Sequence, residues 1–132
     1  MDYSLAQKAV AEAIKKAEEL GIFISVAVVD VYGDLVAFGR MKGAIKISPD
    51  FAISKAYTSG TIGMATSDIA GYAVEGKPYF GLNSLFGGKL TTISGGVTIK
   101  KGEELIGGIG VGGSTDVNQD LECAKTALSV FS

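Results

Sequence analysis

The chain of 132 residues carries 12 basic and 14 acidic side chains, so its formal net charge is -2 and it offers no strong field to attract nucleic acid or anionic lipid. It contains no histidine, which excludes Ser-His and Cys-His nucleophile pairs and removes the commonest metal and haem ligand. The single cysteine, Cys123, can form neither an internal disulfide nor a cysteine metal site. One domain over residues 1–132, with no metal site and no nucleic-acid partner, is therefore predicted.

Residues 3–20 show the pattern of an amphipathic helix. Small and apolar side chains recur at every third or fourth position, while most charged residues fall on the other faces. Asp2 or Ser4 can cap the start, and Gly21 stands where a left-handed C-terminal cap belongs. A helix that ends near Leu20 is predicted.

Two strands and two helices are predicted in the next part of the chain. Residues 22–29 are apolar or β-branched almost without interruption, and residues 35–40 follow a turn rich in Gly and Asp, which predicts an antiparallel hairpin. A capping serine, a proline and an aspartate begin a helix over residues 48–60. A shorter helix is expected to begin at residue 67 or 68 and to end at Val74.

Glycine dominates the chain beyond Tyr79, and short apolar runs lie between the glycines. The runs 90–94, 97–100 and 105–111 are predicted as strands joined by sharp turns, and residues 116–131 as a final amphipathic helix. The resulting order α-β-β-α-α-β-β-β-α contains no βαβ alternation. It predicts an α+β domain with about five antiparallel strands flanked by helices, of profilin-like or PAS-like shape.

The segment from Gly108 to Gly113 matches the pattern G-x-G-x-x-G between a predicted strand and a predicted helix. A dinucleotide site is disfavoured, because no strand follows the last helix and no acidic residue lies about 20 positions further on. Two interpretations stay open. Either the glycine N–H groups and the helix start bind a carboxylate or phosphate, or the glycines serve a bulged strand and a tight turn.

Arg40 and Lys55 are the basic residues with the clearest chemical options. Arg40 can clamp a carboxylate with two hydrogen bonds, and Lys55 can act as a point charge or, when desolvated, as a nucleophile. For both, a surface or intersubunit ion pair is the alternative interpretation. Asp116 and Asp120 fall in the first turn of the last helix, where acids are favoured by the helix dipole, and Cys123 is expected to be a small buried side chain.

The balance of residue types bears on location and assembly. Hydrophobic residues make up 47% and charged residues 20% of the chain, so we expect part of the apolar surface to contact another subunit. No apolar run approaches the ~20 residues of a membrane span, and residues 1–20 lack the apolar core of a signal peptide. We therefore expect a cytoplasmic protein without a membrane partner.

Several short blocks follow one another in a specific order and spacing. They are Val26–Asp30, Gly33 with Leu35–Ala44, Lys55–Thr58, Gly81–Leu82, Gly87–Gly88, Gly95–Val97 and Gly107–Gly113 with Gln119–Asp120. In these blocks the sequence resembles the GlcG/HbpS-like family of haem-degrading type, which is related to the C-terminal domain of PduO-type proteins. The resemblance covers nearly the whole chain. It implies a five-stranded antiparallel sheet and assembly into homo-oligomers, from dimers to octamers.

The resemblance also implies a small-ligand-binding protein, with haem or cobalamin as candidate cofactors. Since the chain has no histidine, an iron ligand would have to be Tyr, Met, Lys, Cys or a hydroxyl group such as that of Thr58 or Thr115. The residues expected to bind the ligand are Arg40, Lys55, Thr58, Gly112, Gly113, Thr115 and Asp120.

Three hypotheses for the function stay open. In the first, an oligomer holds haem, a corrinoid or a small organic anion in a hollow with exposed amide hydrogens, between the glycine-rich end of the last strand and the helix over residues 48–60. In the second, an enzyme acts on a small hydroxy or keto compound with Lys55 as base or Schiff-base former. In the third, the chain is a structural or regulatory oligomer without a ligand.

Overall fold

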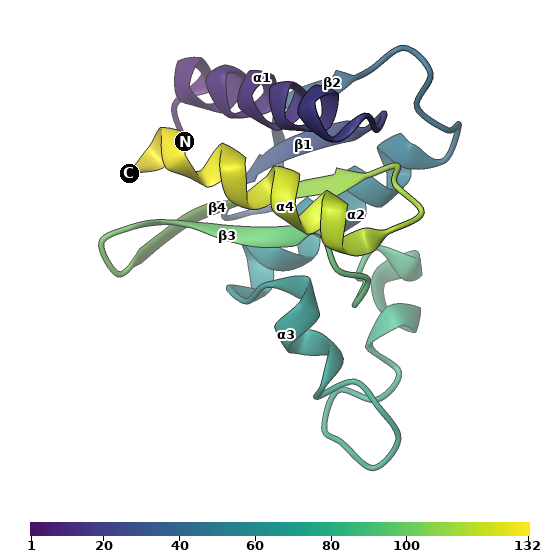
Figure 1. Ribbon diagram of the computed structural model, residues 1–132. Coiled ribbons are helices and arrows are strands. Elements are labelled where there is room, and N and C mark those ends of the chain that lie inside the picture. Colours follow the sequence, from purple (N-terminus) through teal and green to yellow (C-terminus); the bar gives the residue numbers. More distant parts are fainter.

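The computed structural model describes residues 1–132 and contains one antiparallel sheet with the strand order β2-β1-β4-β3 (Figure 1). The elements in chain order are α1 (Tyr3–Leu20), β1 (Ser25–Asp30), β2 (Leu35–Arg40), α2 (Ser48–Ile62), α3 (Thr66–Ala70), the 3-10 segment η1 (Leu82–Gly88), β3 (Gly96–Lys101), β4 (Glu104–Gly112), α4 (Val117–Leu128) and the 3-10 turn η2 (Ser129–Phe131). The α+β class and the antiparallel hairpin of β1 and β2 are confirmed.

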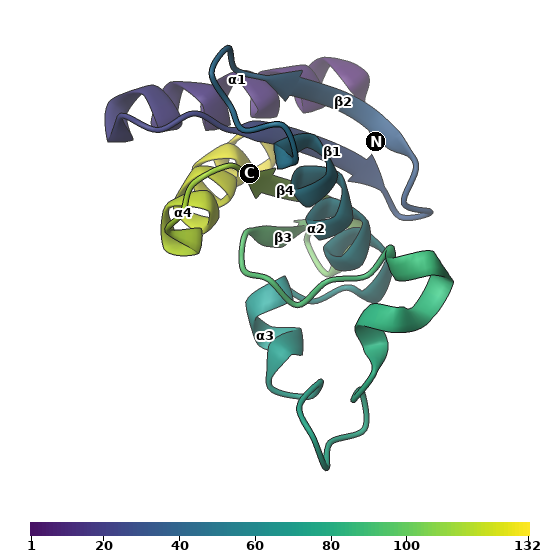
Figure 2. The same cartoon turned by 90° about the vertical axis from the view of Figure 1, so that its right-hand side faces the viewer.

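Helices cover both faces of the sheet. Figure 2 shows α4 on one side of β4 and α2 on the other, with α1 beside α4. The central strand β1 is buried on both faces, as its uninterrupted apolar sequence predicts. Its Val26 and Val28 belong to the main core under α1 and α4, whereas Ala27 and Val29 pack against α2.

The capping and periodicity signals of α1 are confirmed. The Asp2 carboxylate accepts a hydrogen bond from the Ser4 N–H, and Gly21 ends the helix in the left-handed conformation with φ of 71°. The buried residues of α1 are all alanines: Ala6, Ala9, Ala13 and Ala17. These short side chains let α1 lie close to the sheet and to α4. None of the helices combines the length and apolar character that crossing a membrane requires.

The expectation of about five strands is wrong, because residues 90–94 form no strand and the sheet has four. The backbone of this stretch bonds to side chains instead of to a neighbouring strand. The Thr91 N–H donates to Thr58 Oγ1, and the Ile93 N–H donates to Thr91 Oγ1. The third helix is also shorter than expected, since it ends at Ala70 rather than at Val74.

Residues 71–89 leave the body of the molecule and form a protrusion below the sheet (Figure 1). Almost all of them are exposed, and the aromatic side chains of Phe80 and Phe86 are 66% and 70% exposed. A small apolar cluster of Ile69, Leu82 and Leu90 anchors the base of the protrusion. The returning chain then runs along α2 before it enters β3.

Candidate functional site

A buried ion pair joins α2, the end of β4 and the first turn of α4. Lys55 Nζ lies 3.2 Å from Asp120 Oδ2 and donates a 2.8 Å hydrogen bond to the carbonyl oxygen of Val111. Both charged side chains are only 1% exposed. Both residues are expected from the sequence to contact a ligand, and the structure brings them into contact with each other.

The Asp120 carboxylate occupies the anion site that is expected near the start of the last helix. Asp120 Oδ1 accepts a 3.1 Å hydrogen bond from the Ser114 N–H, while its other oxygen faces Lys55. A main-chain N–H and a lysine ammonium are the donors that a bound carboxylate would have used. Both are already engaged within the chain.

Burial perturbs the two partners of the ion pair in opposite senses. Removal from water lowers the pKa of Lys55 below its ordinary value, and the Asp120 charge opposes this shift. Removal from water also raises the pKa of Asp120, and the Lys55 charge and the Ser114 N–H oppose that shift. An ammonium held in this way presents no free amine to a substrate.

The hollow expected beside the glycine-rich end of β4 is filled by direct packing. A Cβ added at Gly108 or Gly110 would run into the backbone of α2, and one added at Gly112 would meet Phe51. Gly113, with φ of 136°, lies against the backbone of Phe23. The glycines of β4 therefore allow close approach of α2 to the sheet, whereas the sequence leads us to expect either an anion site or a bulged strand with a tight turn.

The other expected ligand contacts do not converge with Lys55. Arg40 is exposed at the end of β2, where its guanidinium donates to the Ala44 carbonyl oxygen at 2.8 Å. In the sheet register, Ser25 of β1 lies between Arg40 and Gly112. Thr115 is exposed in the turn before α4.

Thr58 links α2 to the chain that returns from the protrusion. Its hydroxyl is buried, donates to the Ser54 carbonyl oxygen at 2.8 Å and accepts the Thr91 N–H at 3.0 Å. This second bond ties the chain that returns from the protrusion to α2. Thr58 therefore positions one wall of the cavities described next.

Two adjoining cavities of about 420 and 320 Å³ lie along the outward side of α2, and both are lined by Asp50, Ser54 and Gly88. Together they form what we call the α2 groove. The residues of its polar end include Tyr32, Asp34, Tyr57 and Lys89. The residues of its apolar end include Ile47, Phe51, Leu90 and Ile93. Lys55 also borders the apolar end.

Two contacts fix the wall of the groove that faces α2. Ser54 Oγ donates a 2.7 Å hydrogen bond to the Lys89 carbonyl oxygen. The Lys89 ammonium lies 5.3 Å from the centre of the Tyr57 ring, within range of a cation–π interaction. The polar end thus combines one ammonium, two carboxylates from Asp34 and Asp50, and phenol groups.

Most residues of the groove are not among those expected from the sequence to bind a ligand. Asp50, Ser54 and Tyr57 are spaced four and three residues apart, so they lie on one face of the predicted helix. That spacing is the feature of the sequence from which this side of the groove could be predicted. No sequence pattern places Lys89 and Ile93 in the groove, because their position depends on the path of the protrusion.

Residues 1–129 match the family model described as haem degrading protein HbpS-like. The chain belongs to the HbpS-like family. A 15.0 kDa protein in the dhaT-dhaS intergenic region of Citrobacter freundii is 33% identical over 128 residues, which cover 96% of this chain and 89% of that protein. The resemblance drawn from the sequence blocks is confirmed.

Two further comparisons connect the family to tetrapyrroles by name. The corrinoid adenosyltransferase PduO of Salmonella typhimurium is 32% identical over 119 residues, which cover 90% of this chain and 35% of PduO. The chain therefore spans about a third of the length of that relative. The crystal structure of a PduOC:heme complex has a TM-score of 0.93 and 29% identity, and the match covers 98% of this chain and 94% of that one.

Proposed function

We propose that this HbpS-like protein binds a haem-like tetrapyrrole in the α2 groove. The observation that carries the proposal is the junction of two cavities at Asp50, Ser54 and Gly88, with apolar side chains at one end and an ammonium, two carboxylates and phenols at the other. Ligand sites commonly occupy about 300–1,000 Å³ and combine apolar walls with a few polar groups. The haem complex of a relative with the same fold supports this choice of ligand.

The apolar end of the α2 groove suits a flat apolar ring, and Lys89 at the polar end offers one cation to an acidic substituent. Ile47 and Ile93 leave 46% and 43% of their surface exposed at the apolar end, so a bound macrocycle would remove apolar area from water. At the other end, the Lys89 ammonium is available to a propionate group, because Lys89 takes part in none of the three salt bridges of the chain.

The donor set also fits the iron of a haem. The chain has no histidine, but Tyr32 and Tyr57 both line the polar end of the groove, and tyrosine is a known haem ligand. These phenols would hold the iron, and a haem bound there would supply redox or oxygen chemistry. Lys55 supports the groove by fixing α2 to β4 and α4.

A haemin titration followed by absorbance tests the proposal. We expect the wild type to bind haemin and Ser54→Phe to lose binding, because the new ring fills the junction of the two cavities. Ser67→Phe is the matched control, since Ser67 is exposed on α3 and lines neither cavity. Tyr57→Phe is expected to bind with an altered spectrum if its phenol holds the iron.

Two results would overturn this proposal. One is haemin binding that Ser54→Phe leaves unchanged while the circular dichroism spectrum stays that of the wild type. The other is tight binding of cobalamin with no response to haemin, which would assign the groove to corrinoids.

We further infer that the chain forms a homo-oligomer, as its composition suggests. Leu35 and Phe38 on the edge strand β2 are 51% and 38% exposed, and the exposed aromatic side chains of the protrusion add to this apolar surface. Light scattering during size-exclusion chromatography tests this inference. A mass of one chain, 13.6 kDa, at micromolar concentration would contradict it.

A further inference from the structure

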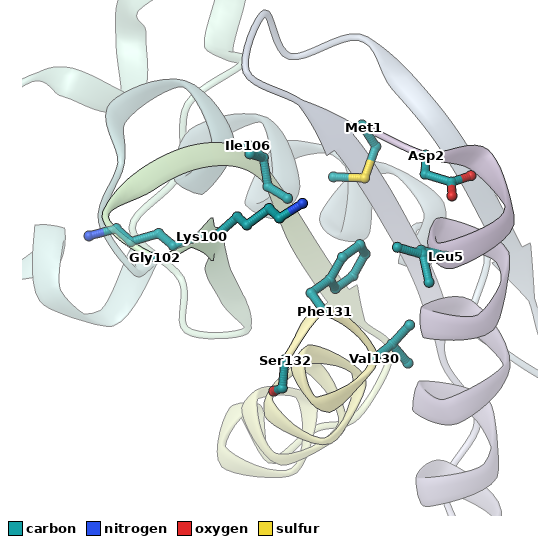
Figure 3. Close-up of a pocket in the computed structure, with 10 residues that line it drawn as sticks. Met1, Asp2, Leu5, Lys100, Gly102, Ile106, Val130, Phe131 and Ser132 are labelled. Carbon is teal, nitrogen blue, oxygen red and sulfur yellow. The ribbon is translucent and has the colours of Figure 1, made fainter.

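A separate cavity of about 680 Å³ lies where the start of α1, the turn between β3 and β4, and the end of the chain meet. Figure 3 shows the side chains that surround it. It shares no lining residue with the α2 groove. The function proposed above leaves this cavity unused.

Five of the ten residues that line the cavity are apolar. Leu5 comes from α1, Ile106 from β4, and Val130 and Phe131 from η2, and in Figure 3 they surround a common space. Met1 also lines the cavity, and its thioether points inward. Because a methionine side chain is unbranched and adaptable, this part of the wall can adjust to the shape of a ligand.

Two lysines, Lys100 and Lys101, line the cavity, and Lys100 reaches toward its apolar side chains. The Lys100 side chain extends from β3 toward Phe131 and Ile106 (Figure 3). Lys100 takes part in none of the three salt bridges. The Asp2 carboxylate, which also lines the cavity, accepts the Ser4 N–H as the cap of α1 and points away from Lys100.

We propose that this cavity binds the carboxylate of a small amphipathic molecule, such as a medium-chain fatty acid. The Lys100 ammonium pairs with the carboxylate, and the hydrocarbon part packs against Leu5, Ile106 and Phe131. The volume lies in the common range for ligand sites. An ammonium at the edge of an apolar wall favours a molecule that joins a carboxylate to a hydrocarbon chain. An alcohol or a cation of the same length cannot form the charge-assisted hydrogen bond and is disfavoured.

Calorimetric titration with decanoate, decanol and decyltrimethylammonium tests the proposal. We expect decanoate to bind most tightly, and we expect Lys100→Met to weaken decanoate about tenfold, the usual effect of losing one hydrogen bond to a charged group. Lys125→Met is the matched control, because Lys125 is exposed on α4 and lies outside this cavity. Ile106→Trp, which fills the cavity, is expected to abolish decanoate binding.

The proposal falls if decanoate does not bind, or if decanol binds as tightly as decanoate. It also falls if Lys100→Met and the Lys125→Met control bind decanoate equally. Since Lys100 is exposed, its replacement is expected to leave folding intact, which thermal melting checks. Ser54→Phe in the α2 groove is expected to keep decanoate binding, and Lys100→Met to keep haemin binding, so the two proposals fail separately.

Discussion

Lys55 and Asp120, 65 residues apart in sequence, meet in the interior with Nζ and Oδ2 3.2 Å apart. The pair connects the helix that borders the groove to the first turn of α4, and the Val111 carbonyl oxygen adds β4 to the connection. Two charges taken out of water in this way are costly, and they are tolerated because each satisfies the other.

Removal of one partner is expected to destabilise the fold strongly. Lys55→Met leaves the Asp120 carboxylate buried without its cation, which costs about 3–5 kcal/mol of unfolding free energy. The double variant Lys55→Met/Asp120→Leu is expected to recover much of this loss. Urea unfolding measures the free energy of unfolding of the single and the double variant.

Lys16→Met is the control, because it removes the partly exposed partner of Glu19 and Glu122. It is expected to shift the urea midpoint little. Equal effects of Lys55→Met and Lys16→Met would contradict a buried pair.

The buried thiol of Cys123 predicts a loss of stability at alkaline pH. Burial, with the nearby Asp120 and Glu122 charges, raises the pKa of this thiol from 9.0 to about 12. Between these values the folded chain keeps the proton and the unfolded chain releases it, so the unfolding free energy falls as pH rises, by up to about 1.4 kcal/mol per unit. Below pH 9 the thiol is protonated in both the folded and the unfolded chain, so the full stability is present and does not change with pH through this group.

Urea midpoints from about pH 8 upward, compared between the wild type and Cys123→Ala, measure this effect. The difference between the two proteins is the readout, because other groups titrate in both. Cys123→Ala is expected to show the shallower decline. Two parallel curves would mean that the thiol is not held protonated by burial.

The close approach of α2 to β4 predicts that Gly110 tolerates no side chain. A Cβ at Gly110 would run into the carbonyl oxygen of Ala52 and the amide of Ala56. Gly110→Ala is therefore expected to cost about 3 kcal/mol of unfolding free energy or to prevent folding. Gly71→Ala is the matched control, since Gly71 has φ of -65° and open space around it. It is expected to be neutral or to stabilise by up to about 1 kcal/mol. A Gly110→Ala protein as stable as the wild type would show that α2 lies further from β4.

The Thr58 hydroxyl is expected to control the wall of the α2 groove. Thr58→Val keeps the shape but leaves the Thr91 N–H without its acceptor, which costs about 1–3 kcal/mol and frees the returning chain. Hydrogen exchange at the Thr91 amide should accelerate, and haemin affinity should fall.

Thr61→Val is the matched control for this change. The Thr61 hydroxyl bonds only to the Tyr57 carbonyl oxygen of its own helix, so no wall of the groove depends on it. The control should leave the exchange rate of the Thr91 amide unchanged. Unaltered exchange in Thr58→Val as well would show that another contact holds the wall.

The local patterns that determine single elements were readable from the sequence. The caps at Asp2 and Gly21 and the spacing of the alanines fixed α1, and the uninterrupted apolar run fixed β1 as a central strand. The helix α1 and the strand β1 can both be predicted because they depend on the conformational preferences of residues that are neighbours in sequence. Residues 90–94 are predicted as a strand but form none, because an apolar run does not show whether a partner strand is available.

The composition and the order of the short blocks determined the class of the fold and the family of the chain. The tertiary structure alone decided what the conspicuous residues do. Lys55, Asp120 and the glycines of β4 looked like ligand contacts, yet they pair or pack with one another, since a charge or a glycine carries no sign of what it will face. The α2 groove and the cavity lined by Lys100 lie where segments distant in the chain meet, so both depend on contacts that no local pattern encodes.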